Sequence, residues 1–353
     1  MNEISENLSH YMRGAATMFY LILSIGVFKE RKESHLKSIL FFSMLFMVFL
    51  TLKDMVLLDT GCYFNDYIIN IIVLVDYLYV PVMALFFLEA VSPGWVSHLR
   101  TAMFLFPFIA GILLYSFTES ESVLFIMFLF AFVFGLAITI IILSAVSERD
   151  NRIKEYFSED SEISVVWVRK AILALFFSLF IWTFLQWDST WAGDSVYFLV
   201  SIIVWTYIYS MAIKHKVVDI PGSEDIQENV YDQDEPQDII PGIEELLLRA
   251  MEEQAPYLNP KITLSDLAST VGTNRTYLSE YLNKSLQMTF YEFINNYRVK
   301  KAVEIMAESP GLTLAEIAEK SGFNSQSTFN RAFMKNVGMQ PARYQKKLFN
   351  ENS

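Results

Sequence analysis

The chain has 353 residues and a net charge of −12, and 53% of its residues are hydrophobic while 19% are charged. An average globular chain is about 25% charged, so this chain has fewer charged residues than average. Its high apolar and low charged content excludes a disordered or collagen-like protein. One cysteine and four histidines exclude an internal disulfide framework and a His-rich metal centre, and the negative charge, taken alone, argues against binding to nucleic acid.

Residues 1–216 contain seven apolar stretches that approach the length of about 20 residues that a helix needs to cross a bilayer. Several of them are too long and too apolar for buried helices of a soluble protein. The stretches are residues 12–28, 38–58, 67–91, 99–117, 122–146, 168–187 and 196–213. We therefore predict a seven-helix transmembrane bundle over residues 1–216.

Lysine and arginine alternate between the loops of this region. The loops after the first, third and fifth stretches carry them, as does the exit from the seventh, whereas loops 59–66, 118–121 and 188–193 carry neither. Short loops rich in Lys and Arg stay in the cytoplasm. The alternation predicts a multi-pass membrane protein with membrane lipid as a partner, an outside N-terminus and a cytoplasmic C-terminal half.

Three ionisable residues lie inside the predicted spans, where such groups mark functional sites. Lys53 and Asp54 lie toward the outer end of the second span, and Asp76 lies inside the third. At about 1.5 Å rise per residue, Lys53 and Asp76 differ in depth by about one helical turn. Two interpretations stay open: an ion pair that fixes the helix packing, or a small polar sensing cavity lined by Asp54 and Asp76.

Residues 217–245 contain ten acidic residues, three prolines and neither Lys nor Arg. High charge with few apolar residues predicts a linker without a packed core. It is either a plain spacer or an electrostatic element. In the second case, anionic lipid and DNA both repel it, and it shields the basic face of the following domain.

Residues 246–353 resemble an ordinary soluble helical domain and contain the same local pattern twice. In each copy a helix, a glycine turn and a second, capped helix follow one another, which is the pattern of a helix-turn-helix. The expected elements are helices 266–271 and 275–286 around Gly272, and helices 314–321 and 326–337 around Gly322, joined by a long helix over 291–308. Asn274 and Ser325 are suited to cap the second helix of each copy. The whole chain is therefore predicted to be all-α.

The second copy carries a set of residues that resembles the signature of the AraC/XylS family of transcription regulators. These residues are Glu316, Ile317, Ala318, Ser321, Gly322, Phe323, Ser325, Ser327, Phe329, Arg331, Phe333, Gly338, Pro341 and Tyr344. The resemblance covers about residues 262–347, under a third of the chain. It implies two helix-turn-helix units whose recognition helices enter successive major-groove segments, with half-sites about 10 bp apart.

The resemblance also implies which side chains contact DNA. Base contacts are expected from Arg275, Thr276, Ser279 and Glu280 in the first unit and from Gln326, Ser327, Asn330 and Arg331 in the second; phosphate contacts are expected from Lys284, Arg298 and Lys335. Arg bridges guanine O6 and N7, while Gln and Asn suit adenine. Glu280 can accept from cytosine N4 but repels nearby phosphate, and each of these residues can also be simply a solvated position on a helix.

Together these observations predict a sequence-specific DNA-binding transcription regulator embedded in the membrane, whose spans sense a signal of unknown identity. A chain that joins a membrane to DNA implies a prokaryote and its inner membrane. Double-stranded promoter DNA is the expected partner, with RNA polymerase and a second copy of the chain as further candidates. The alternative is a membrane transporter or receptor whose helical tail is a protein-interaction module.

No nucleophile motif, phosphate-binding glycine loop, zinc spacing or kinase signature occurs in the sequence, so neither an enzyme nor a cofactor is expected. The net charge also differs from one segment of the chain to another. Residues 262–353 carry eleven basic and eight acidic residues, a net charge of +3, so the negative total does not describe the domain expected to bind DNA.

Overall fold

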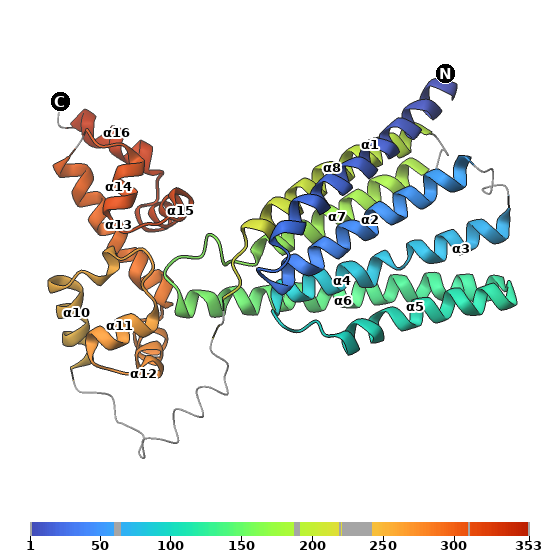
Figure 1. Cartoon of the computed structure of the whole chain (residues 1–353). Coiled ribbons are helices and arrows are strands. Elements are labelled where there is room, and N and C mark those ends of the chain that lie inside the picture. Colours follow the sequence, from blue (N-terminus) through green and yellow to red (C-terminus); the bar gives the residue numbers. More distant parts are fainter. Residues whose placement is uncertain are drawn as a thin grey trace, which may run out of the picture. The chain divides into compact units, whose positions relative to one another are not determined.

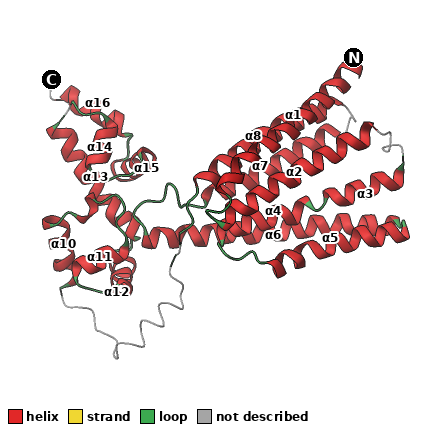
Figure 2. Cartoon of the chain, viewed as in Figure 1, coloured by secondary structure: helices red, strands yellow, loops and turns green. Residues whose placement is uncertain are grey.

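A computed structural model shows an all-α protein, as predicted (Figures 1 and 2). The structure describes residues 2–59, 65–186, 191–218, 220, 242–309 and 311–351. Within these ranges β-type pairing is limited to one isolated antiparallel bridge, between Phe157 and Thr263. The chain divides into two compact units: Met1–Arg149 with Val165–Val217, and Asp150–Ser164 with Val218–Ser353.

The first unit is a helical bundle. It contains α1 (Asn2–Glu30), α2 (His35–Asp59), α3 (Asp66–Asp76), α4 (Tyr79–Val91), α5 (His98–Thr118), most of α6 (Glu121–Tyr156), α7 (Val166–Gln186) and α8 (Trp191–Lys214). One cluster of buried apolar side chains joins α1, α2, α4, α7 and α8 with part of α6, and a second joins α3, α5 and α6. The core of this unit is therefore shared by all eight helices.

The third predicted span is broken in the middle. It is a single apolar stretch in the sequence, yet it forms α3 and α4, with a turn at Tyr77 and Leu78. Pro81 explains the break, because proline has no N–H to donate and its ring clashes with the carbonyl four residues earlier, which is that of Tyr77.

Six helical segments are long and apolar enough to cross a membrane, judged by length and composition over the described residues. They are Glu6–Glu30, His35–Leu57, Asp66–Val91, His98–Thr118, Glu121–Tyr156 and Gly193–Lys214. They coincide with six of the seven predicted spans. The remaining predicted span, residues 168–187 and the sixth in chain order, coincides with helix α7, which is not among these segments and whose side chains from residue 179 onward lie outside the described residues. The number of spans stays a prediction.

The second unit is a set of short helices around two apolar cores. Its elements are α10 (Ile243–Glu253), η2 (Pro256–Leu258), α11 (Leu264–Val271), α12 (Arg275–Glu280), the π-helical turn η3 (Tyr281–Ser285), α13 (Phe290–Glu308), α14 (Leu314–Lys320), α15 (Gln326–Val337) and α16 (Pro341–Glu351). The first half of α13 packs in a core with α10, α11 and α12, and its second half packs in a core with α14 and α15. One helix thus holds both helix-turn-helix units.

The boundary of this second unit differs from the expected one. The predicted linker, residues 217–245, lies mostly outside the described residues. The second unit also includes Asp150–Ser164, which comprises the end of α6 and the loop before α7 and lies inside the range predicted as the membrane bundle. Tyr156, the last residue of α6, lies against the core of the first helix-turn-helix unit.

Candidate nucleic-acid interface

The second helix-turn-helix unit is built from strong local signals. Thr313 and Glu316 form a reciprocal capping box that begins α14, and the Ser325 side chain accepts a hydrogen bond from Thr328 N and begins α15. Gly322 occupies the turn with φ = 89°, where an added Cβ would lie 2.8 Å from Leu258 Cα. These signals explain why the expected helix 326–337 coincides with α15.

The helix α15 presents one apolar and one polar face. Thr328, Phe329, Ala332 and Phe333 are buried in the core, whereas the four predicted base-contacting residues of this helix are exposed: Gln326, Ser327, Asn330 and Arg331. The buried face fixes the orientation of the helix, so the polar face projects from a rigid support.

The first unit has the same order but a less regular second helix. Thr263 and Asp266 form a capping box at α11, Gly272 turns with φ = 77°, and Asn274 caps α12. The expected helix 275–286 is helical as far as Ser285, but only its first six residues are α-helical and the rest form the π-helical turn η3. A π-helical turn changes the angular spacing of side chains, so the second half of the predicted helix does not extend the recognition face.

The four predicted base-contacting residues of the first unit lie on the short α12. Thr276 and Glu280 are exposed, while Arg275 and Ser279 are half-buried. The Arg275 guanidinium lies over the ring of Tyr156, 5.5 Å from its centroid. Glu280 pairs with Lys284 one turn later. Two of the expected DNA contacts are thus already engaged with neighbours inside the unit.

The three predicted phosphate contacts behave differently from one another. Lys284 and Lys335 are exposed, and each pairs with a carboxylate, Glu280 and Glu292 respectively. Arg298 is fully buried, so its prediction as a phosphate contact is wrong. Its position on α13 gave no sign of burial, because the partners that enclose it come from distant parts of the chain.

The Arg298 side chain has a structural role instead. It donates to the carbonyl of Tyr257 at 2.8 Å, to that of Asn259 at 2.9 Å and to that of Ser158 at 3.2 Å. Burial lowers the pKa of Arg298 to about 10, so the guanidinium stays charged at neutral pH. A buried cation that binds three backbone carbonyls holds segments together and does not reach DNA.

Residues 267–347 match the protein family described as "Helix-turn-helix domain". The Msm operon regulatory protein of Streptococcus mutans is 29% identical over 89 residues, which cover 25% of this chain and 32% of that protein. The melibiose operon regulatory protein of Escherichia coli is 29% identical over 85 residues, 24% of this chain and 28% of that protein. A putative AraC-like transcription regulator of Streptomyces lividans is 31% identical over 84 residues, 24% of this chain and 27% of that protein.

The C-terminal domain is an AraC-type helix-turn-helix domain. No solved structure matches the chain. Since the chain spans less than a third of each of these three relatives, the likeness concerns the domain alone. Its polar faces on α12 and α15 have the chemistry required to read base edges, namely guanidinium, amide and hydroxyl groups on exposed helix positions.

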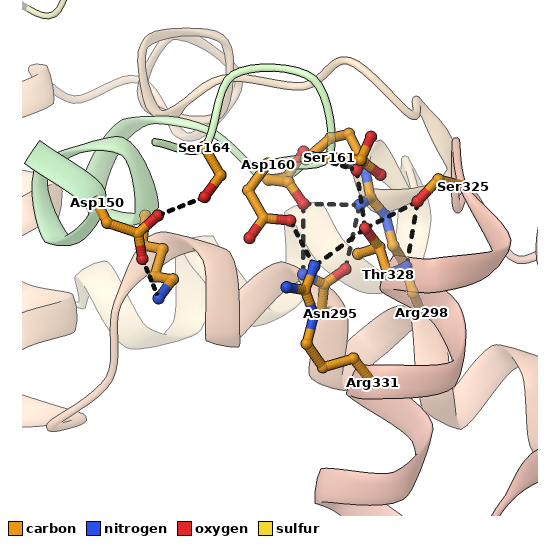
Figure 3. A network of polar contacts seen from close by, with 12 residues as sticks. Asp150, Asp160, Ser161, Ser164, Asn295, Arg298, Ser325, Thr328 and Arg331 are labelled. Atoms are coloured by element: carbon orange, nitrogen blue, oxygen red, sulfur yellow. Dashed lines mark hydrogen bonds and ion pairs between the residues drawn. The ribbon is translucent and has the colours of Figure 1, made fainter. Parts of the chain in front are cut away.

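An acidic loop lies against the second recognition helix of the AraC-type domain (Figure 3). Arg331 Nη2 lies 2.7 Å from Asp160 Oδ1, and Thr328 Oγ1 donates to Glu159 Oε1 at 2.8 Å. Burial raises the pKa of Asp160, the Arg331 guanidinium lowers it, and the net direction is upward. The 57% exposed side chain of Arg331 is thus tied to a carboxylate that is only 2% exposed.

In the apolar unit, the three predicted sensing residues lie together. Lys53 Nζ lies 2.6 Å from Asp54 Oδ1 and 3.0 Å from Asp76 Oδ1. The Lys53 side chain is mostly buried, at 11% exposure. The pairing of Lys53 with Asp76 expected from their depths is present, while a sensing role for the group stays a prediction. Among the described residues, no cluster of His, Cys, Asp and Glu could hold a metal ion.

Sequence reasoning missed Ser158, Glu159 and Asp160. The loop that contains them was considered only for its Lys and Arg, because these determine orientation in a membrane. A signal was nevertheless present, since four acidic residues lie between positions 155 and 162, close to a basic recognition helix only in the folded chain.

Proposed function

We propose that this protein is a membrane-embedded transcription regulator whose AraC-type domain reads promoter DNA in a sequence-specific manner. The observation that carries the proposal is the exposed polar face of α15, where Gln326, Asn330 and Arg331 project from a helix seated on a buried core. A face that docks another protein is richer in aromatic side chains.

The chemistry of the face suits base recognition. A guanidinium can bridge O6 and N7 of guanine and an amide can bridge N6 and N7 of adenine, each with about 1–3 kcal/mol of discrimination against the wrong base. Because α13 packs in both cores, the two units form one body that can contact two half-sites about 10 bp apart. RNA polymerase and a second copy of the chain are further expected partners, and no catalytic activity is expected.

We further propose that the first unit lies in the inner membrane, with its N-terminus outside and the AraC-type domain in the cytoplasm. Large apolar side chains are exposed along its helices, among them Ile22, Phe42, Phe106, Phe132 and Phe177. Such a surface is unfavourable in water but suits lipid. Resistance of the protein to carbonate extraction, with protease access to the C-terminal domain from the cytoplasmic side only, is the expected result.

A signal would reach the spans directly, and the group of Lys53, Asp54 and Asp76 is the proposed place where it acts. An ionisable group inside a span is unfavourable unless it serves packing or function. Lys53→Met and Asp76→Asn are expected to change the output of a target promoter while membrane insertion stays normal. Unchanged output with normal insertion would leave the ion pair a packing feature.

Chromatin pull-down of the tagged full-length chain tests the regulator function. Discrete genomic peaks are expected for the native protein, and Arg331→Ala should lose them. Arg249→Ala is the matched control, because it removes an exposed guanidinium from α10 of the same unit. Peaks that persist in Arg331→Ala contradict sequence-specific reading by α15.

A further inference from the structure

One residue on the recognition face of α15, Arg331, is bound by a segment of the same chain. Residues 157–164 follow α6 and precede α7. Figure 3 shows the loop that carries Asp160 and Ser161 lying against the helix that carries Thr328 and Arg331. This segment is either a permanent part of the domain or an element that binds α15 reversibly.

The segment is anchored at Ser158, which is buried. Its carbonyl accepts from Arg298 Nη1 at 3.2 Å and from Asn295 Nδ2 at 3.3 Å, and its hydroxyl donates to the carbonyl of Ile262 at 2.8 Å. Phe157 adds the bridge to Thr263. The anchor therefore grips α13 and the chain just before α11, both of which are central to the domain.

From this anchor, the next two residues reach the recognition helix. Glu159 accepts from Thr328, and Asp160 binds Arg331 through its guanidinium. Asp160 also accepts at its carbonyl from Ser164 N at 2.9 Å, and the Ser164 hydroxyl donates to Asp150 at 2.7 Å on the end of α6. The segment is thus a compact turn with its carboxylates directed at α15.

The Asp160 carboxylate competes with DNA for the guanidinium of Arg331. A guanidinium that binds a carboxylate through Nη2 cannot present its full fork to guanine O6 and N7. Carboxylates at the recognition helix also repel the phosphates that a bound duplex would bring near. At the first unit, Tyr156 lies under Arg275, so the same stretch of chain engages the leading arginine of each recognition helix.

The covalent links of this segment to α6 and α7 provide a way to pull it away from α15. The segment is joined at one end to α6 and at the other to α7, and both helices belong to the apolar unit for most of their length. A shift of α6 relative to α7 therefore acts on the segment through the covalent chain. A signal received among the spans can reach the recognition helices by this route.

We propose that residues 157–164 are an autoinhibitory element that binds Arg331 on the recognition face of α15 and has to release it before promoter DNA binds. The proposal rests on the proposed DNA-reading function. It assigns a regulatory role to the α6–α7 connection.

The test compares DNA affinities of the full-length chain in nanodiscs of neutral lipid at one salt concentration. The probe is a fluorescent duplex of about 40 base pairs, long enough for two adjacent half-sites, taken from the strongest Arg331-dependent chromatin peak. If no such peak exists, a random-sequence pool of the same length takes its place. Asp160→Asn keeps the shape of the side chain and removes its charge, and is expected to bind about tenfold more tightly than the native chain. The double variant Glu159→Gln with Asp160→Asn should bind more tightly still.

Glu155→Gln is the matched control. It removes one negative charge from the same stretch, and Glu155 is not among the described partners of Thr328 and Arg331. Its affinity should stay within about twofold of the native value, as expected for a surface change. An equal gain in Glu155→Gln and Asp160→Asn would reduce the effect to net charge and overturn the autoinhibitory assignment.

Hydrogen exchange of the peptide over residues 157–164 gives an independent readout. Saturating DNA is expected to speed its exchange in the native chain, because the segment leaves the domain. Exchange that does not change on DNA binding would show a permanent structural element and overturn the proposal.

Failure of the two ideas can be told apart. If the DNA-reading function is correct and autoinhibition is not, the native chain binds the duplex as tightly as Asp160→Asn and loses binding in Arg331→Ala. If no variant shows Arg331-dependent binding, the DNA-reading function itself is contradicted, and the autoinhibitory assignment with it.

Discussion

The two helix-turn-helix units of the AraC-type domain share an order of elements but not a degree of regularity. The second unit has a recognition helix of 12 residues, α15, with a side-chain cap at its start and a glycine at its end. The first has a recognition helix of six residues that continues into a π-helical turn. From this difference we expect base reading to be concentrated in the second unit, while the first orients the domain on DNA.

The ion pairs of the two recognition helices differ in the same sense. In the first unit, Glu280 is engaged by Lys284 from its own helical turn. In the second, Arg331 is engaged by Asp160 from a loop far away in the sequence. A local pair is part of the unit and stays with it, whereas a distant partner can be withdrawn. Control of the domain is therefore expected at the second unit.

The largest expected effect contrasts the two turn glycines. Gly322 has φ = 89° and its missing Cβ would meet the backbone of Tyr257 and Leu258, whereas Gly272 has φ = 77° with nothing within 4 Å. Gly322→Ala is therefore expected to cost about 3 kcal/mol of unfolding free energy, from backbone strain plus the clash, and Gly272→Ala about 1 kcal/mol, from strain alone.

Pulse proteolysis in urea, followed through a C-terminal tag on the full-length chain in detergent, measures this contrast. The tag is needed because all six tryptophans lie in residues 1–216, so fluorescence does not follow the AraC-type domain. Equal destabilisation by the two substitutions would show that the turn of the second unit does not pack on η2.

A second prediction concerns Arg298, which lies on the helix between the two units. Arg298→Ala removes the guanidinium that donates to the carbonyls of Tyr257, Asn259 and Ser158, and is expected to lower the unfolding free energy by about 3 kcal/mol. Lys300→Ala, an exposed cation on the same helix, should change it by about 0.5 kcal/mol or less.

The same proteolysis measures both variants. The expectation from sequence alone was different, since a phosphate-contacting Arg298 would reduce the salt dependence of DNA binding and leave stability unchanged. A lower salt dependence of DNA binding with unchanged stability in Arg298→Ala would support Arg298 as a phosphate contact after all.

A third prediction compares the arginines of the two recognition helices. In the Asp160→Asn background, Arg331→Ala is expected to cost about 1–3 kcal/mol of DNA-binding free energy and to relax the preference at one base pair. Arg275→Ala should cost less and leave base preference unchanged, because Arg275 is half-buried against Tyr156. Selection from a randomised duplex pool measures both quantities, and a larger loss of specificity in Arg275→Ala would reverse the division of labour between the units.

How well the sequence predicted each part depends on how local its cause is. The bounds of α15 were correct because Ser325, at its start, and Gly338, just past its end, act on backbone groups within one turn. The helix expected over 275–286 is present as far as Ser285, but residues 281–285 form a π-helical turn that no local signal predicted. The break at Tyr77 had a local cause, Pro81, that the apolar pattern concealed.

The functional side chains follow the same rule. Exposure of Gln326, Ser327, Asn330 and Arg331 could be predicted from helical periodicity. The burial of Arg298 and the engagement of Arg331 could not, because their partners lie 140 and 171 residues away in the chain. Such contacts depend on how the whole domain closes, and a positive-inside count of the α6–α7 loop ignores the acidic residues that make them.

The smallest expected effect is on the pH dependence of stability, for which the capping-box carboxylates of the two units can be compared. Hydrogen bonds from the backbone N–H and the hydroxyl of Thr313 lower the pKa of Glu316 below its usual 4.5. A carboxylate with a lowered pKa contributes stability that is present above 4.5 and is lost as the pH falls through the lowered value. Glu316→Gln keeps an acceptor for Thr313 but does not titrate, so the loss of stability below about pH 4.5 should become less steep.

Glu292, whose pKa Lys335 and Thr289 lower against the effect of burial, still titrates, so the slope is reduced and not abolished. Asp266→Asn at the capping box of the first unit is the matched variant, and a slope in Glu316→Gln identical to that of the native chain would show that the second box does not depend on a charged carboxylate.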